Sequence, residues 1–218
     1  MIVMIPLLGK SENNYIELRY CLRGIEKHVK PDKVVIVGGL PSWAKNIQHI
    51  PFSDDKNIEW KERNIYNKIC KAFQYYDEFL FMNDDHFLLA PFNYLHHKGN
   101  MFERKKTYAQ FSSYGYTLQN TLNTFGNSIN DFDTHCPIIY DKQKFERLKQ
   151  LDWSKTFGYA IKTSYVYLNH LQHDGTFYED SKFMLEIGNV KNRKYFSTGD
   201  NCNFKMLPLI YPNKSKYE

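Results

Sequence analysis

Three apolar runs, separated by two segments with helical periodicity, occupy the first 82 residues of this chain. The runs are IVMIPLL (2–8), KVVIVGGLP (33–41) and EFLFM (78–82), and their near-continuous apolar character is typical of strands that are buried on both faces of a sheet. The segments between them, 13–29 and 61–76, have the spacing of amphipathic helices. This alternation predicts an α/β fold with a mainly parallel central sheet.

The pattern becomes less regular after residue 92, where we expect a helical C-terminal lobe in the same single domain. Asn14 is a plausible N-cap for the first helix, and Glu17 would complete a capping box. The later elements that we expect are a strand over 107–114, a helix over 141–151 capped by Asp141, a longer helix over 154–172 and a strand over 193–198 that returns to the sheet.

Composition sets the broad class of the protein. Of the 218 residues 42% are hydrophobic and 17% aromatic, which is enough for a substantial core. The net charge of +5 is compatible with an anionic ligand but is too small to indicate nucleic-acid binding by itself. The four scattered cysteines form no C-x-x-C pair, so we expect neither a zinc site nor a disulfide framework. With no signal peptide and no membrane-spanning run, the sequence favours a cytoplasmic protein.

The stretch NDD at 83–85 follows the third apolar run directly. In an open α/β sheet, ligands bind beyond the carboxyl ends of the strands, so Asn83, Asp84 and Asp85 are expected at that edge. Adjacent carboxylates repel each other, and a hard divalent cation such as Mg²⁺ or Mn²⁺ would relieve the repulsion while binding a diphosphate. The alternative is an ordinary surface turn, which Asn and Asp also favour.

Other candidate residues are isolated in the sequence. Arg19 and Arg23 lie four residues apart on the first helix, where they would either bind a phosphate or pair with Glu17 or Glu26. His135 would be a general base, a ligand contact or a structural histidine. Asp200, in STGDNC, would be a further metal or acid–base carboxylate or part of a Gly-Asp-Asn turn.

Several blocks of the sequence, taken in order, match the pattern of a known family. The blocks are ELRYCLRGIEKH (17–28), PSW (41–43), FLFMNDDHFL (79–88), THCPIIYDKQKFERL (134–148), YFSTGDN (195–201) and LPLIYPNKSKYE (207–218). They resemble the Stealth family of sugar-phosphate transferases and, more broadly, GT-A glycosyltransferases. The family's opening Tyr-Thr-Trp-Val-Asp-Gly block is absent, and MIVMIPLLGKSENN stands in its place. An arginine found downstream of the family's histidine block corresponds to Lys162 here, which is not an equivalent phosphate ligand.

The resemblance implies a single GT-A-like, Rossmann-like domain, with a nucleotide-sugar-binding half at 1–92 and an acceptor and catalytic half at 93–218. It implies Asp84, Asp85 and Asp200 as ligands of Mn²⁺ or Mg²⁺. The catalytic residues that it implies are His135, Asp85 and Lys162. The donor-binding residues are Arg19, Arg23, Arg63, Asn67, Lys68, Asn83 and Asp84.

The function expected from this resemblance is transfer of a sugar, or of a sugar phosphate, from a nucleotide-sugar donor to an acceptor hydroxyl. The acceptor is a surface polysaccharide or, if the protein is a phage-type enzyme, a hydroxylated base in DNA. The alternative is a non-catalytic module that binds nucleic acid or carbohydrate, in which Asp84 and Asp200 would be dispensable.

Overall fold

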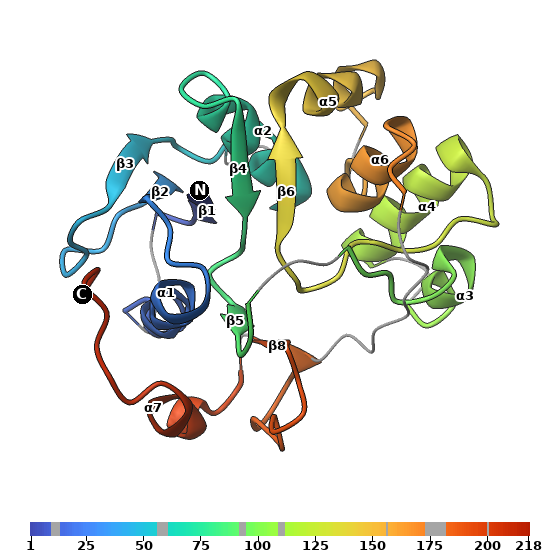
Figure 1. Ribbon diagram of the computed structural model, residues 1–218. Coiled ribbons are helices and arrows are strands. Elements are labelled where there is room, and N and C mark those ends of the chain that lie inside the picture. Colours follow the sequence, from blue (N-terminus) through green and yellow to red (C-terminus); the bar gives the residue numbers. More distant parts are fainter. Residues whose placement is uncertain are drawn as a thin grey trace.

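The computed structural model describes residues 1–9, 14–55, 61–91, 95–108, 112–155, 157–172, 182–199 and 201–218. Its centre is a five-stranded sheet with the strand order β3-β2-β1-β4-β6 (Figure 1). The first four of these strands along the sheet are parallel, and β6 is antiparallel to β4, so the predicted mainly parallel sheet is confirmed. The strands are β1 (Ile2–Leu7), β2 (Lys33–Gly38), β3 (Gln48–Pro51), β4 (Glu78–Phe81) and β6 (Ile138–Asp141).

Helices α1 and α2 cover opposite faces of this sheet. Alternate residues of β1 show the two faces, because successive side chains of a strand point in opposite directions. Ile5 is buried in the cluster that contains Leu22 of α1, whereas Met4 is buried in the cluster that contains Ile69 of α2. Burial on both faces explains why the strands are apolar throughout. The helices are α1 (Ile16–His28) and α2 (Lys61–Ala72).

A second, three-stranded sheet has the order β5-β8-β7. The strand predicted over 193–198 is β8, but it pairs with β5 and β7 instead of returning to the central sheet. The acidic turn NDD connects the two sheets, because it lies between β4 and β5. The strands of this sheet are β5 (His86–Leu88), β7 (Lys182–Phe183) and β8 (Tyr195–Thr198).

Of the remaining helices, α4 has 13 residues, as α1 does, and the others have eight or fewer. Figure 1 shows α3, α4 and α6 gathered beyond β6, on the side away from β3, while α7 lies near α1. Within the described residues, no helix combines the length and the apolar character needed to span a bilayer. These elements are α3 (Met101–Lys105), α4 (Ser113–Phe125), α5 (Lys142–Glu146), η1 (Arg147–Gln150), α6 (Ile161–Leu168), η2 (Phe204–Met206) and α7 (Leu207–Ile210).

Two of the later predictions are corrected by backbone geometry. The segment 107–114 is not a strand where it is described, since Ser112 caps α4 by accepting a hydrogen bond from the Gly115 amide at 3.1 Å. The helix predicted over 154–172 is limited to α6, because Phe157 and Gly158 adopt positive φ angles of 78° and 58° ahead of it. Asp141 caps α5 as predicted, with the Lys144 amide 2.9 Å from its carboxylate.

The start of α1 differs from the predicted capping box. Asn14 and Tyr15 have φ angles of 53° and 57°, a left-handed conformation that is costly for side chains other than glycine. Tyr15 occupies the N-cap position without a side-chain cap. The Glu17 carboxylate instead accepts a hydrogen bond from the Thr198 hydroxyl of β8. A tertiary contact has therefore replaced the local cap.

Candidate functional site

The acidic turn Asn83–Asp85 lies at the point of the central sheet where the strand order reverses. β1 has β2 and then β3 on one side and β4 on the other, and β4 runs parallel to β1. At such a switch point the connections leave adjacent strands toward opposite faces and leave a crevice at their carboxyl ends. The turn follows the carboxyl end of β4, which is the position expected from the sequence.

The carboxylate of Asp85 is held by residues from the second sheet. Its Oδ2 accepts a hydrogen bond from Ser197 Oγ at 3.0 Å and lies 3.5 Å from Lys182 Nζ. Its Oδ1 lies 3.8 Å from His86 Nε2. The side chain is 19% exposed, so the carboxylate is fixed in position and remains accessible from one side.

Asp84 lies among like charges. Burial, followed by the charges of Asp85 and Glu17, raises the pKa of Asp84 to about 7, while the charge of Lys68 acts in the opposite direction. Glu17 comes from α1, so two distant segments of the chain bring carboxylates to the same place. Crowded carboxylates of this kind are found at functional sites, where a ligand relieves the repulsion.

The His86 ring connects His135 to the acidic turn. The Asn83 amide donates to His86 Nδ1 at 3.3 Å, so the proton of the neutral His86 ring resides on Nε2, the nitrogen nearest Asp85. The His135 ring meets the His86 ring edge-on, with 6.1 Å between the centroids. His135 is half-buried. The structure therefore brings together two predicted site elements that are separated by 50 residues.

Lys162 is buried and contacts the peptide groups on either side of His135. Its side chain is 4% exposed, and its ammonium donates to the carbonyl oxygens of Thr134 and Cys136 at 2.5 and 2.7 Å. The catalytic role that the resemblance implies for Lys162 stays a prediction.

The two arginines of α1 are engaged with the C-terminal segment. Arg23 binds the Glu218 carboxylate through Nε and NH2 at 2.7 and 2.8 Å and donates to the Tyr211 carbonyl. These contacts anchor the C-terminal segment on α1, and donor binding by Arg23 stays a prediction. The Arg19 guanidinium lies 4.0 Å from the centroid of the Trp43 ring, and its NH1 lies 3.6 Å from a carboxylate oxygen of Glu218. Within the described part of the chain, the ion-pair partner of both arginines is therefore Glu218.

The three donor candidates on α2 face different surroundings. Lys68 is buried and donates to the Leu7 carbonyl at the end of β1 and to Asp54, both at 2.9 Å. Its charge also lowers the pKa of Asp84, against the larger effects of burial and of Asp85. Hydrogen bonds from Ser154, and to a smaller extent the charge of Arg63, lower the pKa of Asp152, and Asn67 is half-buried. Of the three, Lys68 is the residue whose charge and hydrogen bonds connect it to the site.

The ends of β1 and β2 approach each other closely beside this site. Gly38 has a φ of +125°, and a Cβ added there would lie 1.9 Å from the Leu7 carbonyl oxygen. Only glycine fits this position. The same Leu7 carbonyl accepts the hydrogen bond from Lys68, so the ends of β1 and β2 and the Lys68 side chain meet at one point.

Asp200 lies outside the described residues, so its predicted place in the site stays a prediction. Among the described residues, no three His, Cys, Asp or Glu side chains converge into a metal-binding group. The Asn83 side-chain oxygen is buried and accepts no hydrogen bond from the described part of the chain. Two carboxylates and an unused amide oxygen in one turn are the hard oxygen donors that Mg²⁺ and Mn²⁺ prefer.

Several site residues were missed by sequence reasoning. Glu17 was assigned to a local cap, and Ser197 and Thr198 were regarded only as parts of a strand. The available signal is the pair of hydroxyl residues at the end of the predicted strand 193–198, which is the same strand-end criterion that identifies Asp84 and Asp85. Lys182 carried no recognisable signal.

The comparisons with known proteins leave the function to be argued from the site. No protein-family model matches the chain, and no curated protein matches it in sequence. Among solved structures, the chain is similar to the galactosyltransferase LgtC in complex with donor and acceptor sugar analogues, with 13% identity and a TM-score of 0.44 over 84% of this chain and 76% of that chain. A likeness at this level does not by itself assign a function. The fold and site define an α/β protein with an acidic turn at the switch point of its central sheet.

Proposed function

We propose that this protein is a glycosyltransferase that transfers a sugar, or a sugar phosphate, from a nucleotide-sugar donor to an acceptor hydroxyl. The observation that carries the proposal is the Asp84–Asp85 turn at the switch point, with the His135 ring beside it through His86. A nucleotide bound at such a crevice would direct its diphosphate toward the strand ends. The resemblance of several sequence blocks to Stealth-type transferases supports the same chemistry.

The oxygen ligands that the acidic turn offers fit a divalent cation such as Mg²⁺ or Mn²⁺. Asp84 and Asp85 would hold it, with the Asn83 side-chain oxygen as a further ligand and Asp200 as the carboxylate that the family resemblance adds. Such cations keep several coordination positions for phosphate oxygens and water. When bound, the cation would neutralise the charge that develops on the diphosphate leaving group.

The protein's own residues would divide the remaining chemistry. His135 would accept the proton of the acceptor hydroxyl as the new bond forms between that oxygen and the anomeric carbon, while the bond from this carbon to the diphosphate oxygen breaks. In sugar-phosphate transfer the same hydroxyl would attack the β-phosphorus, the bond from this phosphorus to the oxygen bridging the two phosphates would break, and the nucleoside monophosphate would leave. Lys182, whose side chain is 34% exposed at Asp85, would balance part of the phosphate charge.

The acceptor that we favour is a glycan hydroxyl, since this is the default for the family that the sequence resembles. DNA carrying a hydroxylated base is the other outcome to be tested. Binding to DNA would depend steeply on salt, because basic side chains release counterions from the phosphate backbone. Binding to a neutral glycan would show little salt dependence.

A screen of thermal stability tests the proposed donor class. Nucleotide sugars with different bases and sugars are added to the protein with and without Mn²⁺, and the melting temperature is measured. A donor at 100 times its Kd should stabilise the protein by about 2.7 kcal/mol, and this effect should require the metal. A protein that responds to no nucleotide sugar under either condition would contradict the proposal and favour a binding module.

A further inference from the structure

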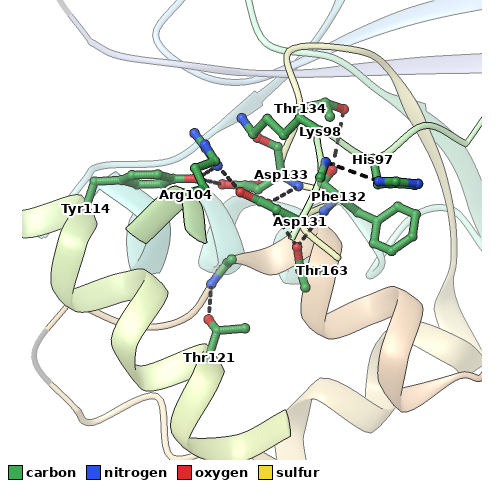
Figure 2. A network of polar contacts seen from close by, with 12 residues as sticks. His97, Lys98, Arg104, Tyr114, Thr121, Asp131, Phe132, Asp133, Thr134 and Thr163 are labelled. Atoms are coloured by element: carbon green, nitrogen blue, oxygen red, sulfur yellow. Dashed lines mark hydrogen bonds and ion pairs between the residues drawn. The ribbon is translucent and has the colours of Figure 1, made fainter. Parts of the chain in front are cut away.

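The segment that carries His135 is held by buried polar contacts along its whole length. Figure 2 shows residues 131–134 of this segment surrounded by side chains from several helices. Asp131 pairs with Arg104 of α3, and its other oxygen accepts hydrogen bonds from the Asp133 amide at 2.8 Å and the Thr163 hydroxyl at 3.3 Å. The first half of the segment is therefore fixed through a fully buried carboxylate.

Further contacts fix the middle of the segment. Lys98 Nζ donates to the Asp133 carbonyl at 2.6 Å, and Tyr114 of α4 donates its hydroxyl to the Asp133 carboxylate at 2.7 Å. The Phe132 amide donates to Thr163 Oγ1 of α6 at 2.9 Å. These contacts leave the backbone little freedom up to residue 134, immediately before the histidine.

Lys162 completes this support at the histidine itself. Its ammonium donates to the carbonyls of Thr134 and Cys136, the two residues that flank His135. It also lies 5.9 Å from the centroid of the Phe81 ring, and Phe81 is the last residue of β4 before the acidic turn. One side chain of α6 therefore contacts both segments that meet at the site.

We propose that Lys162 is a positioning residue that holds the His135 imidazole toward the acidic turn by fixing the peptide groups on either side of it. This inference rests on the proposed function, in which His135 serves as the base. A lysine ammonium has three donors and no acceptor, so it can bind both carbonyls at once. No neutral side chain of similar length offers the same three donors. Without the ammonium, two carbonyls next to His135 would lose their partner and the segment would be free to shift.

Two variants of Lys162 test this role. Lys162→Met removes the donors and keeps the length of the chain, while Lys162→Gln keeps an amide donor and decides the question if the Met variant does not fold. Thr121→Val is the matched control. Thr121 is also buried, and it accepts a hydrogen bond from the amide of Ala160, just before α6, away from His135.

The decisive readout is the imidazole signal of His135 in NMR spectra of protein labelled with ¹⁵N in histidine, assigned with a His135→Gln variant. We expect this signal to shift or broaden in Lys162→Met, to change less in Lys162→Gln, and to stay in place in Thr121→Val. In turnover assays, kcat of the Met variant should fall by about 10- to 100-fold, with KM for the donor changed by less than about threefold, as expected for a misplaced catalytic group.

An unchanged His135 signal in folded Lys162→Met or Lys162→Gln would overturn the inference, as would an equal change in Thr121→Val. Failure of the proposed function is distinguishable from this. In that case the unmodified protein turns over no donor, while the NMR comparison still shows whether Lys162 positions His135.

Discussion

Replacing Asp85 with asparagine is expected to lower donor turnover by at least about 1,000-fold, because loss of a metal ligand removes several kcal/mol of transition-state stabilisation. The fold should survive this change. The asparagine side-chain oxygen can still accept the hydrogen bond that Ser197 Oγ now gives to Asp85 at 3.0 Å. Turnover is measured as release of nucleotide from the donor identified by thermal stability, and folding is checked by circular dichroism.

Asp77→Asn is the matched control for this variant. Asp77 lies just before the opposite end of the same strand, and its side chain is 91% exposed in a contact of 3.5 Å with Lys142. Its replacement should leave turnover within about twofold of the unmodified protein, since exposed ion pairs contribute little. If the Asp85 variant kept most of its activity, the acidic turn would not be the catalytic centre.

Asp131→Ala should destabilise the fold more than any of the other substitutions. The Asp131 side chain is fully buried and forms an ion pair with Arg104, whose own side chain is 17% exposed. Removing the carboxylate leaves the guanidinium buried without its partner, which typically costs about 3–5 kcal/mol. A loss of this size is a large part of the total stability of a domain. Urea denaturation followed by fluorescence measures it.

Glu103→Gln provides the comparison, because Glu103 lies on α3 next to Arg104, the partner of Asp131. Glu103 pairs with Lys106 at 2.7 Å, but both side chains are more than half exposed. We expect a loss of about 0.5 kcal/mol or less, because the ion pair is exposed to solvent. Should Asp131→Ala cost no more than this surface variant, the buried network would not be a major source of stability.

The central strands were predictable because a strand that is buried on both faces is a nearly continuous apolar run in the sequence. β1, β2 and β4 are apolar runs, and the structure places each within two or three residues of its predicted ends. β3 was missed because its four residues include only one buried side chain, Ile50. The helix over 154–172 was overestimated, since the positive φ at Phe157 depends on surrounding packing and leaves no clear mark in a tyrosine-rich sequence.

The candidate site was predictable only where its residues are neighbours in the sequence. The acidic turn follows a strand, and that position alone placed Asp84 and Asp85 at the sheet edge. The contacts that complete the site join residues far apart in the chain. Ser197 reaches Asp85 across 112 positions, and Thr198 reaches Glu17 across 181. The ion pair of Arg23, a predicted donor-binding residue, could not be foreseen either, because its partner Glu218 lies 195 residues away.

Titration with Mn²⁺, followed by electron paramagnetic resonance, tests most directly whether the acidic turn and a cation together bind the diphosphate. The unmodified protein and an Asp84→Asn, Asp85→Asn double variant are each titrated with and without the nucleoside diphosphate of the preferred donor. We predict one Mn²⁺ site in the unmodified protein that tightens when the nucleotide is present, and loss of both effects in the double variant. Equal Mn²⁺ binding by the two proteins in the presence of nucleotide would contradict the account.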